Sequence, residues 1–290
     1  MSRSNPTTSS KSYRGAIGLV LLAGAFAVFW IALIVIFPDI QATGIRSVVT
    51  RVIIHTIILT GLWLGLARTD LDAGTRTKVW LAIAVPFTAW LGVVWWLAID
   101  GVFRPSPGGG VPSLPIAIFL PVLLGLPLLL SSKRVASILD ATPASWLIGL
   151  QVYRVFGGIF LLLSSRGGLS AIFALPAGVG DVLVGLLALP VAYLVHAKAR
   201  YAARLGIAWN VLGLVDFAIA IGLGVLTTQQ IIVPDRPNTQ LGVFPTVMIP
   251  TFAVPSSILL HVLSLWQLQR IARKGSCKPS IGREAANQGG

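Results

Sequence analysis

The chain has 290 residues, of which 55% are hydrophobic and only 11% are charged, so it cannot bury its apolar surface inside one soluble core. The net charge of +13 does not indicate a nucleic-acid-binding protein, because the Lys and Arg residues are scattered over short segments and form no single basic face. We therefore predict an integral membrane protein without a nucleic-acid partner.

Eight apolar runs approach or reach the roughly 20 residues that a helix needs to cross the hydrocarbon core of a bilayer. They cover residues 15–37, 48–67, 79–99, 114–130, 146–163, 172–195, 205–226 and 245–268. Lipid offers backbone groups no hydrogen-bonding partner, so runs this long must be helices. The predicted fold class is all-α, a polytopic bundle of about eight transmembrane helices in a single membrane domain.

The segments outside this domain are short. Residues 1–14 are predicted to be a cytoplasmic tail, and residues 269–290 a disordered basic tail. Lys11 and Arg14 precede the first run, and the sequence AGA at 23–25 resembles the cleavage site of a secretory signal. The apolar run continues well past that point, so we predict an uncleaved helix and no cleaved signal peptide.

The distribution of positive charge predicts the orientation. Sixteen of the 22 Lys and Arg residues fall in the N-terminal tail, the second, fourth and sixth loops or the C-terminal tail, and five fall on the other side. Because positive loops stay in the cytoplasm, both termini are predicted to be cytoplasmic, in a multi-pass protein of the cell membrane, expected to be a bacterial inner membrane. The basic loops are expected to contact anionic headgroups, with Asp70 and Asp72 as local charge balance.

Prolines suggest two further features. The predicted halves 15–134 and 143–268 each end in a helix with three prolines, which is compatible with a duplication of four helices although the spacings differ. In the last helix, Pro250 and Pro255 free the carbonyls of the residues four positions earlier, Thr246 and Thr251. We expect there either a kinked, polar-lined helix facing a cavity or a static bend filled by a neighbouring helix.

Three ionisable residues lie near the predicted midplane, namely Arg154, Asp181 and Asp216, each on a different helix. Exposing a charge to lipid at this depth is costly, so we expect the three to face one another. Arg154 stays protonated, and two ionised carboxylates beside it would leave one uncompensated negative charge. Burial then favours a protonated Asp or a bound cation, which is the basis for predicting proton or cation coupling. A purely structural cluster is the alternative.

A second set of polar residues, Gln151, Asn210 and His261, lies closer to the predicted cytoplasmic side. Gln151 is three residues from Arg154, and Asn210 is six residues from Asp216, so each shares a helix face with a charged residue. We expect these three side chains to line a path from the charged site to the cytoplasm.

The remaining candidates lie near the ends of the spans. Arg46, Arg51 and His55 are expected to extend to the outer headgroups, and an anion-binding outer entrance is the alternative. Haem ligation by two histidines requires similar depths, whereas His55 lies nearer the outside, His261 nearer the inside and His196 at a cytoplasmic helix end. No cofactor is therefore predicted.

Enzyme and metal motifs are not found: the sequence has no HExxH, no GxSxG and only one cysteine, Cys277. We predict no catalytic residues and no metal site. The leading hypothesis is a small-solute or proton-coupled transporter whose ligand is a proton or a small molecule. The alternatives are a membrane accessory or structural protein and a redox protein holding haem or quinone.

Overall fold

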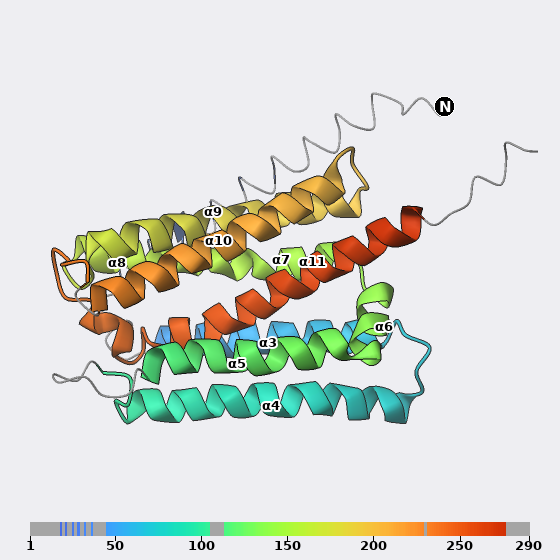
Figure 1. Cartoon of the computed structure of the whole chain (residues 1–290), viewed down its shortest axis with the longest axis horizontal. Coiled ribbons are helices and arrows are strands. Elements are labelled where there is room, and N and C mark those ends of the chain that lie inside the picture. The colour runs from blue at the N-terminus through green and yellow to red at the C-terminus, as the bar shows by residue number, and fades with distance from the viewer. Residues whose placement is uncertain are drawn as a thin grey trace, which may run out of the picture.

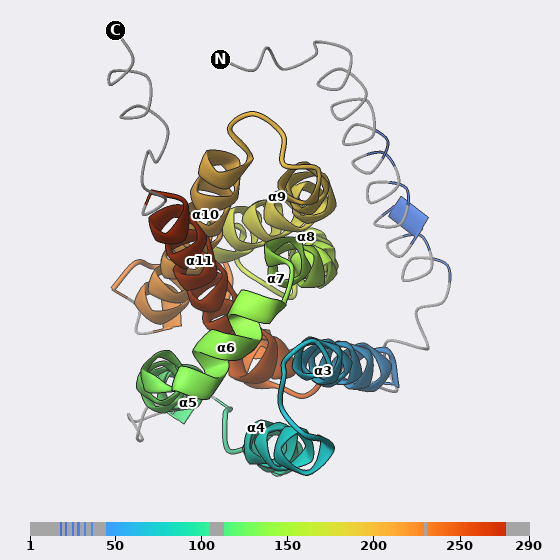
Figure 2. The same ribbon diagram turned by 90° about the vertical axis from the view of Figure 1, so that its right-hand side faces the viewer.

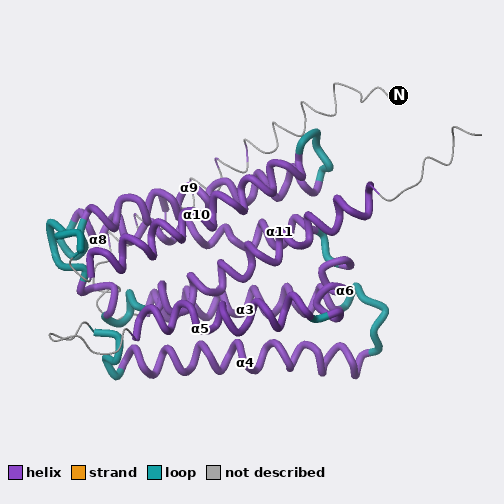
Figure 3. The backbone as a smooth tube through the Cα atoms, viewed as in Figure 1, coloured by secondary structure: helices purple, strands orange, loops and turns teal. Residues whose placement is uncertain are grey.

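The computed structural model describes residues 45–104, 113–228 and 231–276, together with isolated positions between 18 and 36. All regular structure in these ranges is helical, which confirms the all-α prediction for the described part of the chain (Figures 1 and 3). Apart from those isolated positions, the helix predicted at residues 15–37 lies outside the described residues.

Within these ranges, seven helical rods are long and apolar enough to cross a membrane. They lie in α3 (Ile45–Leu66), α4 (Ala73–Ile99), α5 (Ser113–Ser131), the rod made of α7 (Ala144–Gly149), η1 (Leu150–Gly158) and α8 (Ile159–Ser165), α9 (Ala171–His196), α10 (Ala202–Thr228), and the rod made of η3 (Ile249–Ala253) and α11 (Val254–Ser276). Two short elements complete the fold, α6 (Lys133–Ala141) and η2 (Thr239–Gly242).

The helices form two groups joined by α11. Figure 2 shows α7, α8, α9 and α10 on one side of the bundle and α3, α4 and α5 on the other. Helix α11 contacts α10 and α7 in the first group and α5 in the second. Large apolar side chains also cover the outside, as at Leu123 and Leu128 of α5, which are 68% and 70% exposed. A helix that is apolar all round is typical of a membrane span.

Helix α4 begins at Ala73, six residues before the expected start at residue 79. The Asp72 carboxylate accepts a 3.0 Å hydrogen bond from the backbone N–H of Thr75 and thus caps the helix. This bond to Thr75 lowers the pKa of Asp72 below its ordinary value. Asp72 therefore has a structural role in addition to the expected charge balance.

The segment after α5 is not a simple loop. Residues Lys133–Ala141 form the amphipathic helix α6, capped by Ser132 and buried through Val135, Ile138 and Leu139. Its last turn is held by α11, where Gln267 Nε2 donates to the carbonyls of Leu139 and Thr142 at 2.5 and 2.7 Å. A short helix with a strongly one-sided apolar face was missed because it falls between two longer apolar runs.

The last rod differs from the expected span at both ends. It starts at Ile249, not residue 245, and it continues to Ser276, so the first eight residues of the tail predicted to be disordered are helical. Residues Ile249–Ala253 form a π-helical turn. The Thr251 carbonyl, four residues before Pro255, accepts a 3.1 Å hydrogen bond from the Trp90 indole of α4. At this carbonyl, a neighbouring helix fills the bend.

The loop between α10 and η3 is fastened to the start of α9. Asn238 accepts from the Ser170 backbone N–H at 2.9 Å and donates to Thr227 Oγ1 at 2.7 Å. The Ser170 hydroxyl donates to Asp235 and lowers the pKa of this carboxyl group. Leu241, in η2, is buried against Phe160 and Phe173. This end of the α8, α9 and α10 group is therefore closed by a folded loop.

Candidate functional site

The centre of the rod that carries Arg154 is a 3₁₀ helix, Leu150–Gly158. Such a helix has three residues per turn, so Gln151, Arg154 and Gly157 fall on one edge, and all three are buried. The segment packs directly on α9: a Cβ at Gly185 would lie 3.0 Å from the backbone carbonyl carbon of Arg154. Close backbone contact of this kind is what small residues allow between membrane helices.

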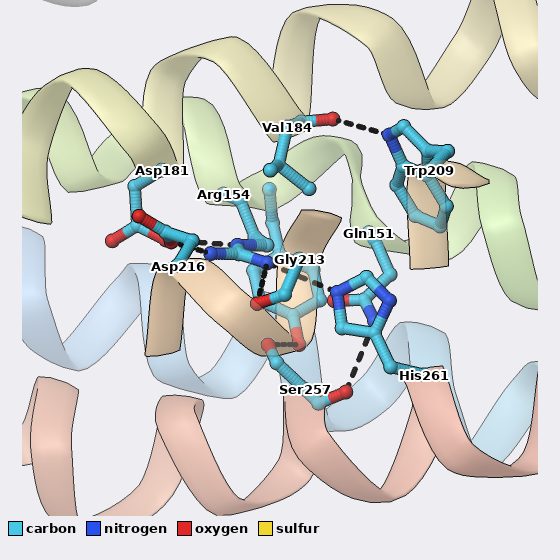
Figure 4. Close-up of polar contacts among 10 residues, drawn as sticks. Gln151, Arg154, Asp181, Val184, Trp209, Gly213, Asp216, Ser257 and His261 are labelled. Atoms are coloured by element: carbon cyan, nitrogen blue, oxygen red, sulfur yellow. Dashed lines mark hydrogen bonds and ion pairs between the residues drawn. The ribbon is translucent and has the colours of Figure 1, made fainter. Parts of the chain in front are cut away.

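Arg154 is the centre of the polar cluster. Its Nε donates to Asp181 Oδ1 at 2.8 Å and its Nη2 donates to Asp216 Oδ2, so one guanidinium joins α9 and α10. Its Nη1 donates to His261 Nε2 at 3.0 Å and reaches the Gly213 carbonyl at 3.4 Å (Figure 4). The structure thus brings the three predicted midplane residues together, and every guanidinium nitrogen of Arg154 has a partner.

The ring of Phe217 completes the surroundings of this guanidinium, because Arg154 Cζ lies 3.9 Å from the ring centroid. A cation over an aromatic face is stabilised by the ring quadrupole. The Arg154 side chain is only 1% exposed, whereas those of Asp181 and Asp216 are 12% and 9% exposed. The carboxylates therefore form the more accessible side of the cluster.

His261 has a defined tautomer. Its Nδ1 lies 2.9 Å from Asn210 Oδ1, and the orientation of the Asn210 amide is fixed because its Nδ2 donates to the Gly206 carbonyl at 2.8 Å. An amide oxygen and a guanidinium nitrogen each allow only one direction of hydrogen bonding. Nδ1 must therefore carry the proton and Nε2 must accept from Arg154, which makes His261 a neutral imidazole in this arrangement.

Three glycines make room for these side chains. A Cβ on Gly157 would overlap the Asp181 side chain, one on Gly180 would overlap the Asp216 carboxylate, and one on Gly213 would overlap the His261 ring. Each charged or polar group is thus seated against the bare backbone of a neighbouring helix. The three-residue stripe Asn210, Gly213 and Asp216 is one part of this arrangement.

Gln151 does not join the Arg154 cluster. Its Nε2 donates to the Ser257 carbonyl at 3.0 Å, and the Ser257 hydroxyl lies 2.6 Å from the Tyr153 hydroxyl. Gln151 Oε1 is buried without a partner among the described residues. The three residues expected on the cytoplasmic side therefore separate: Asn210 and His261 contact each other, and Gln151 belongs to a neighbouring polar group with Tyr153 and Ser257.

The structure bears on the expected outer group of Arg46, Arg51 and His55 only in part. The side chain of Arg46 lies outside the described residues. His55 lies against Phe87 of α4, with 4.9 Å between ring centroids, and its Nε2 is 3.0 Å from Thr88 Oγ1. The expectation that Arg51 extends to the headgroups is wrong, because Arg51 is only 6% exposed.

Arg51 changes the charge balance that the sequence predicted. It interacts electrostatically with Asp181 and Tyr153, so it lies near the cluster centred on Arg154. With Arg51 counted, the buried charged residues of this region are two arginines and two aspartates, whose charges cancel when both Asp181 and Asp216 are ionised. The predicted excess of one negative charge took only Arg154 into account.

Sequence reasoning also missed a polar stripe on α11. Ser257, His261, Ser264 and Gln267 are each at most 1% exposed, and they follow one another at steps of four, three and three residues. This spacing puts them on one helix face, a signal that the sequence contains. The Ser264 hydroxyl accepts from Asn210 Nδ2 at 3.0 Å, so the stripe is where α11 contacts the polar residues of α10.

The chemistry of the cluster follows from its groups. Arg154 does not release its proton, and the unprotonated Nε2 of His261 already accepts a hydrogen bond from Arg154. Among the described cluster residues, a proton or cation would therefore be accepted by Asp181 or Asp216. In the same ranges, no group of three or more His, Cys, Asp or Glu residues is placed to hold a metal ion.

Fold and site together define an all-helical bundle of membrane-length apolar helices around a buried Arg and Asp cluster. Residues 111–269, more than half of the chain, match the family described as Domain of unknown function (DUF8737), and the chain belongs to this family. Comparisons with curated proteins and with solved structures found no match. The matched range includes Arg154, Asp181, Asp216 and His261, whereas Arg51 precedes it.

Proposed function

We propose that the chain is an integral membrane protein that moves a small solute, with Arg154, Asp181 and Asp216 as its ion-coupling site. The observation that carries this proposal is the single guanidinium held between two carboxylates from adjacent helices, inside a bundle of membrane-length rods. Ionisable residues within membrane helices are costly and in general mark ion or substrate pathways.

The placement of basic residues supports a membrane orientation. Figure 1 shows the α3–α4 connection, α6, the α9–α10 turn and the end of α11 at one end of the bundle. Ten Lys and Arg residues with described side chains lie in these segments or in the adjoining first turns of α4 and α10: Arg68, Arg76, Lys78, Lys133, Arg134, Lys198, Arg200, Arg204, Arg270 and Arg273. The other end has Arg104, Arg166 and Arg236. We assign the basic end to the cytoplasm, against anionic headgroups, with eight spans and both termini on that side.

The coupling mechanism follows from accessibility and charge. Asp181 and Asp216 are slightly exposed while Arg154 is enclosed, so a proton or cation can reach the carboxylates without exposing the guanidinium. Protonation of Asp216 would weaken its hydrogen bond with Arg154 and loosen α10 from η1. His261 and Asn210 would hold the other side of the guanidinium in place during this change, with Gln151 lining the adjacent path.

Reconstituted protein tests this proposal. Proteoliposomes would be assayed under an imposed pH gradient for uptake of labelled nitrate, succinate, glycine and glucose, one probe for each of four solute classes. We expect pH-driven uptake of at least one probe by the wild type and none by Asp181→Asn or Asp216→Asn, both of which should remain folded. Absence of uptake with every probe, or equal uptake by the variants, would contradict the proposal.

A structural role for the cluster is the second candidate, and one observation favours it. Every guanidinium nitrogen of Arg154 is paired, as a static staple requires. A buried ion pair can often be replaced by apolar residues without loss of stability. The staple predicts that Arg154→Met combined with Asp181→Leu restores whatever Arg154→Met alone loses, whereas a coupling site predicts stable but inactive protein.

A further inference from the structure

Within the described ranges, Arg51 has no hydrogen-bonding partner, whereas every guanidinium nitrogen of Arg154 has one. Its residue is 6% exposed, and its Nε is fully enclosed without a partner. No hydrogen bond or salt bridge joins its guanidinium to any residue in the described ranges. A guanidinium has five N–H donors, and leaving donors unsatisfied inside a protein costs free energy.

The position of Arg51 relates it to the proposed coupling site. It is the seventh residue of α3, about 9 Å from the end of that helix at about 1.5 Å per residue. Helix α3 contacts η1, and Arg51 interacts electrostatically with Tyr153 of η1 and Asp181 of α9. The free guanidinium therefore lies inside the bundle, beside the Arg154 cluster and on its α3 side.

We propose that Arg51 binds a planar oxyanion group, such as a carboxylate, of the solute that the protein moves. This inference rests on the proposed function, because it names the substrate class of that site. The rigid fork of a guanidinium matches the two oxygens of a carboxylate, with which it forms paired hydrogen bonds. An anion on Arg51 would accept a hydrogen bond from the enclosed Nε, which the described residues leave unpaired, and from a neighbouring Nη.

Charge balance links this anion to a proton. The charges of Arg51 and Arg154 balance those of Asp181 and Asp216 when both carboxylates are ionised, and the nearby titratable groups are Tyr153 of η1, the neutral His261 imidazole of α11 and His55, one turn after Arg51 on α3. A monoanion on Arg51 gives the group one excess negative charge in a medium of low dielectric constant. Uptake of one proton by Asp181 or Asp216 removes this excess, so the anion and the proton enter together.

Equilibrium binding tests the inference without depending on transport. The full chain, purified in nanodiscs of zwitterionic lipid, would be titrated calorimetrically with acetate, with nitrate as a second planar oxyanion, and with neutral acetamide. The variants are Arg51→Gln, Arg51→Lys and the control Arg200→Gln, whose exposed guanidinium stacks over Tyr201 at 4.8 Å. If Arg51→Gln does not fold, Arg51→Lys, which keeps the charge but not the fork, decides the test.

The wild type and Arg200→Gln should bind acetate and nitrate but not acetamide. Arg51→Gln should bind acetate at least ~10-fold more weakly, as expected for the loss of a charged hydrogen bond, and Arg51→Lys should be intermediate. The inference would be overturned if the wild type did not bind acetate or if Arg51→Gln bound it with equal affinity. It would also be overturned if anionic lipid in the nanodisc abolished acetate binding, because the ligand of Arg51 would then be a lipid headgroup. Binding without uptake would refute the transport proposal alone.

Discussion

His261 Nε2 of α11 accepts a 3.0 Å hydrogen bond from Arg154 Nη1, while its Nδ1 is held by Asn210 of α10. The imidazole thus connects the guanidinium to the polar stripe of α11. Because both ring nitrogens are engaged, His261 is fixed in one tautomer and one orientation. His261 therefore supports Arg154, and in our proposal it is the carboxylates that accept a proton.

His261→Phe should destabilise the protein, since Arg154 Nη1 would keep only the 3.4 Å contact with the Gly213 carbonyl. A buried donor left unsatisfied costs about 1–3 kcal/mol. The free energy of unfolding would be measured by denaturant titration in mild detergent. His196→Phe, at the exposed end of α9, is the matched control and should have little effect. Equal stabilities of the two variants would show that His261 does not support Arg154.

Gly180→Ala and Gly213→Ala should each reduce stability, because the added methyl group would overlap the Asp216 carboxylate or the His261 ring. Overpacking of this kind costs about 1–3 kcal/mol. Gly222→Ala in the same helix as Gly213 is the control, since nothing lies within 4 Å of its Cβ position. This control should be neutral or stabilising by up to ~1 kcal/mol. Tolerance of both cluster substitutions would contradict the close packing described above.

The stability of the first turn of α4 should depend on pH through the ionisation of Asp72. The hydrogen bond from Thr75 lowers the pKa of Asp72 below its ordinary 3.8, so the ionised form stabilises the helix start. This stabilisation is complete above that ordinary value and is lost as the pH falls through the lowered pKa. At low pH, the amides of residues 73–77 should therefore lose protection, so that their exchange rates come closer to the intrinsic rates of an unfolded chain at the same pH. Asp72→Ala should show the fast exchange at all pH values.

The single cysteine offers a test of the orientation. Cys277 belongs to the tail that we assign to the cytoplasm. In right-side-out vesicles, a membrane-impermeant maleimide should not label Cys277 until the membrane is permeabilised. Val233→Cys, placed in a Cys277→Ser background, should be labelled at once, because Val233 is 81% exposed in the loop at the opposite end. The reverse labelling pattern would invert the proposed topology.

The sequence predicted that Arg154, Asp181 and Asp216 lie against one another, because exposing a charged side chain to lipid is costly. It failed for Arg51, since an arginine at the seventh position of a helix can either extend to the headgroups or turn inward. Packing between α3 and η1 selects one of these two orientations, and no periodic pattern in the sequence indicates which one. The helix α6 was missed for a different reason: nine residues are too short for an apolar-run criterion designed for spans.

The most direct test of the coupling site is infrared difference spectroscopy of the folded protein in lipid, titrated over the pH range in which it stays folded. We expect a band of a protonated carboxyl group that rises and falls with pH and that disappears in Asp181→Asn, in Asp216→Asn or in both. A carboxyl spectrum that does not change with pH, or a titrating band that survives in both variants, would contradict the claim that this cluster takes up a proton.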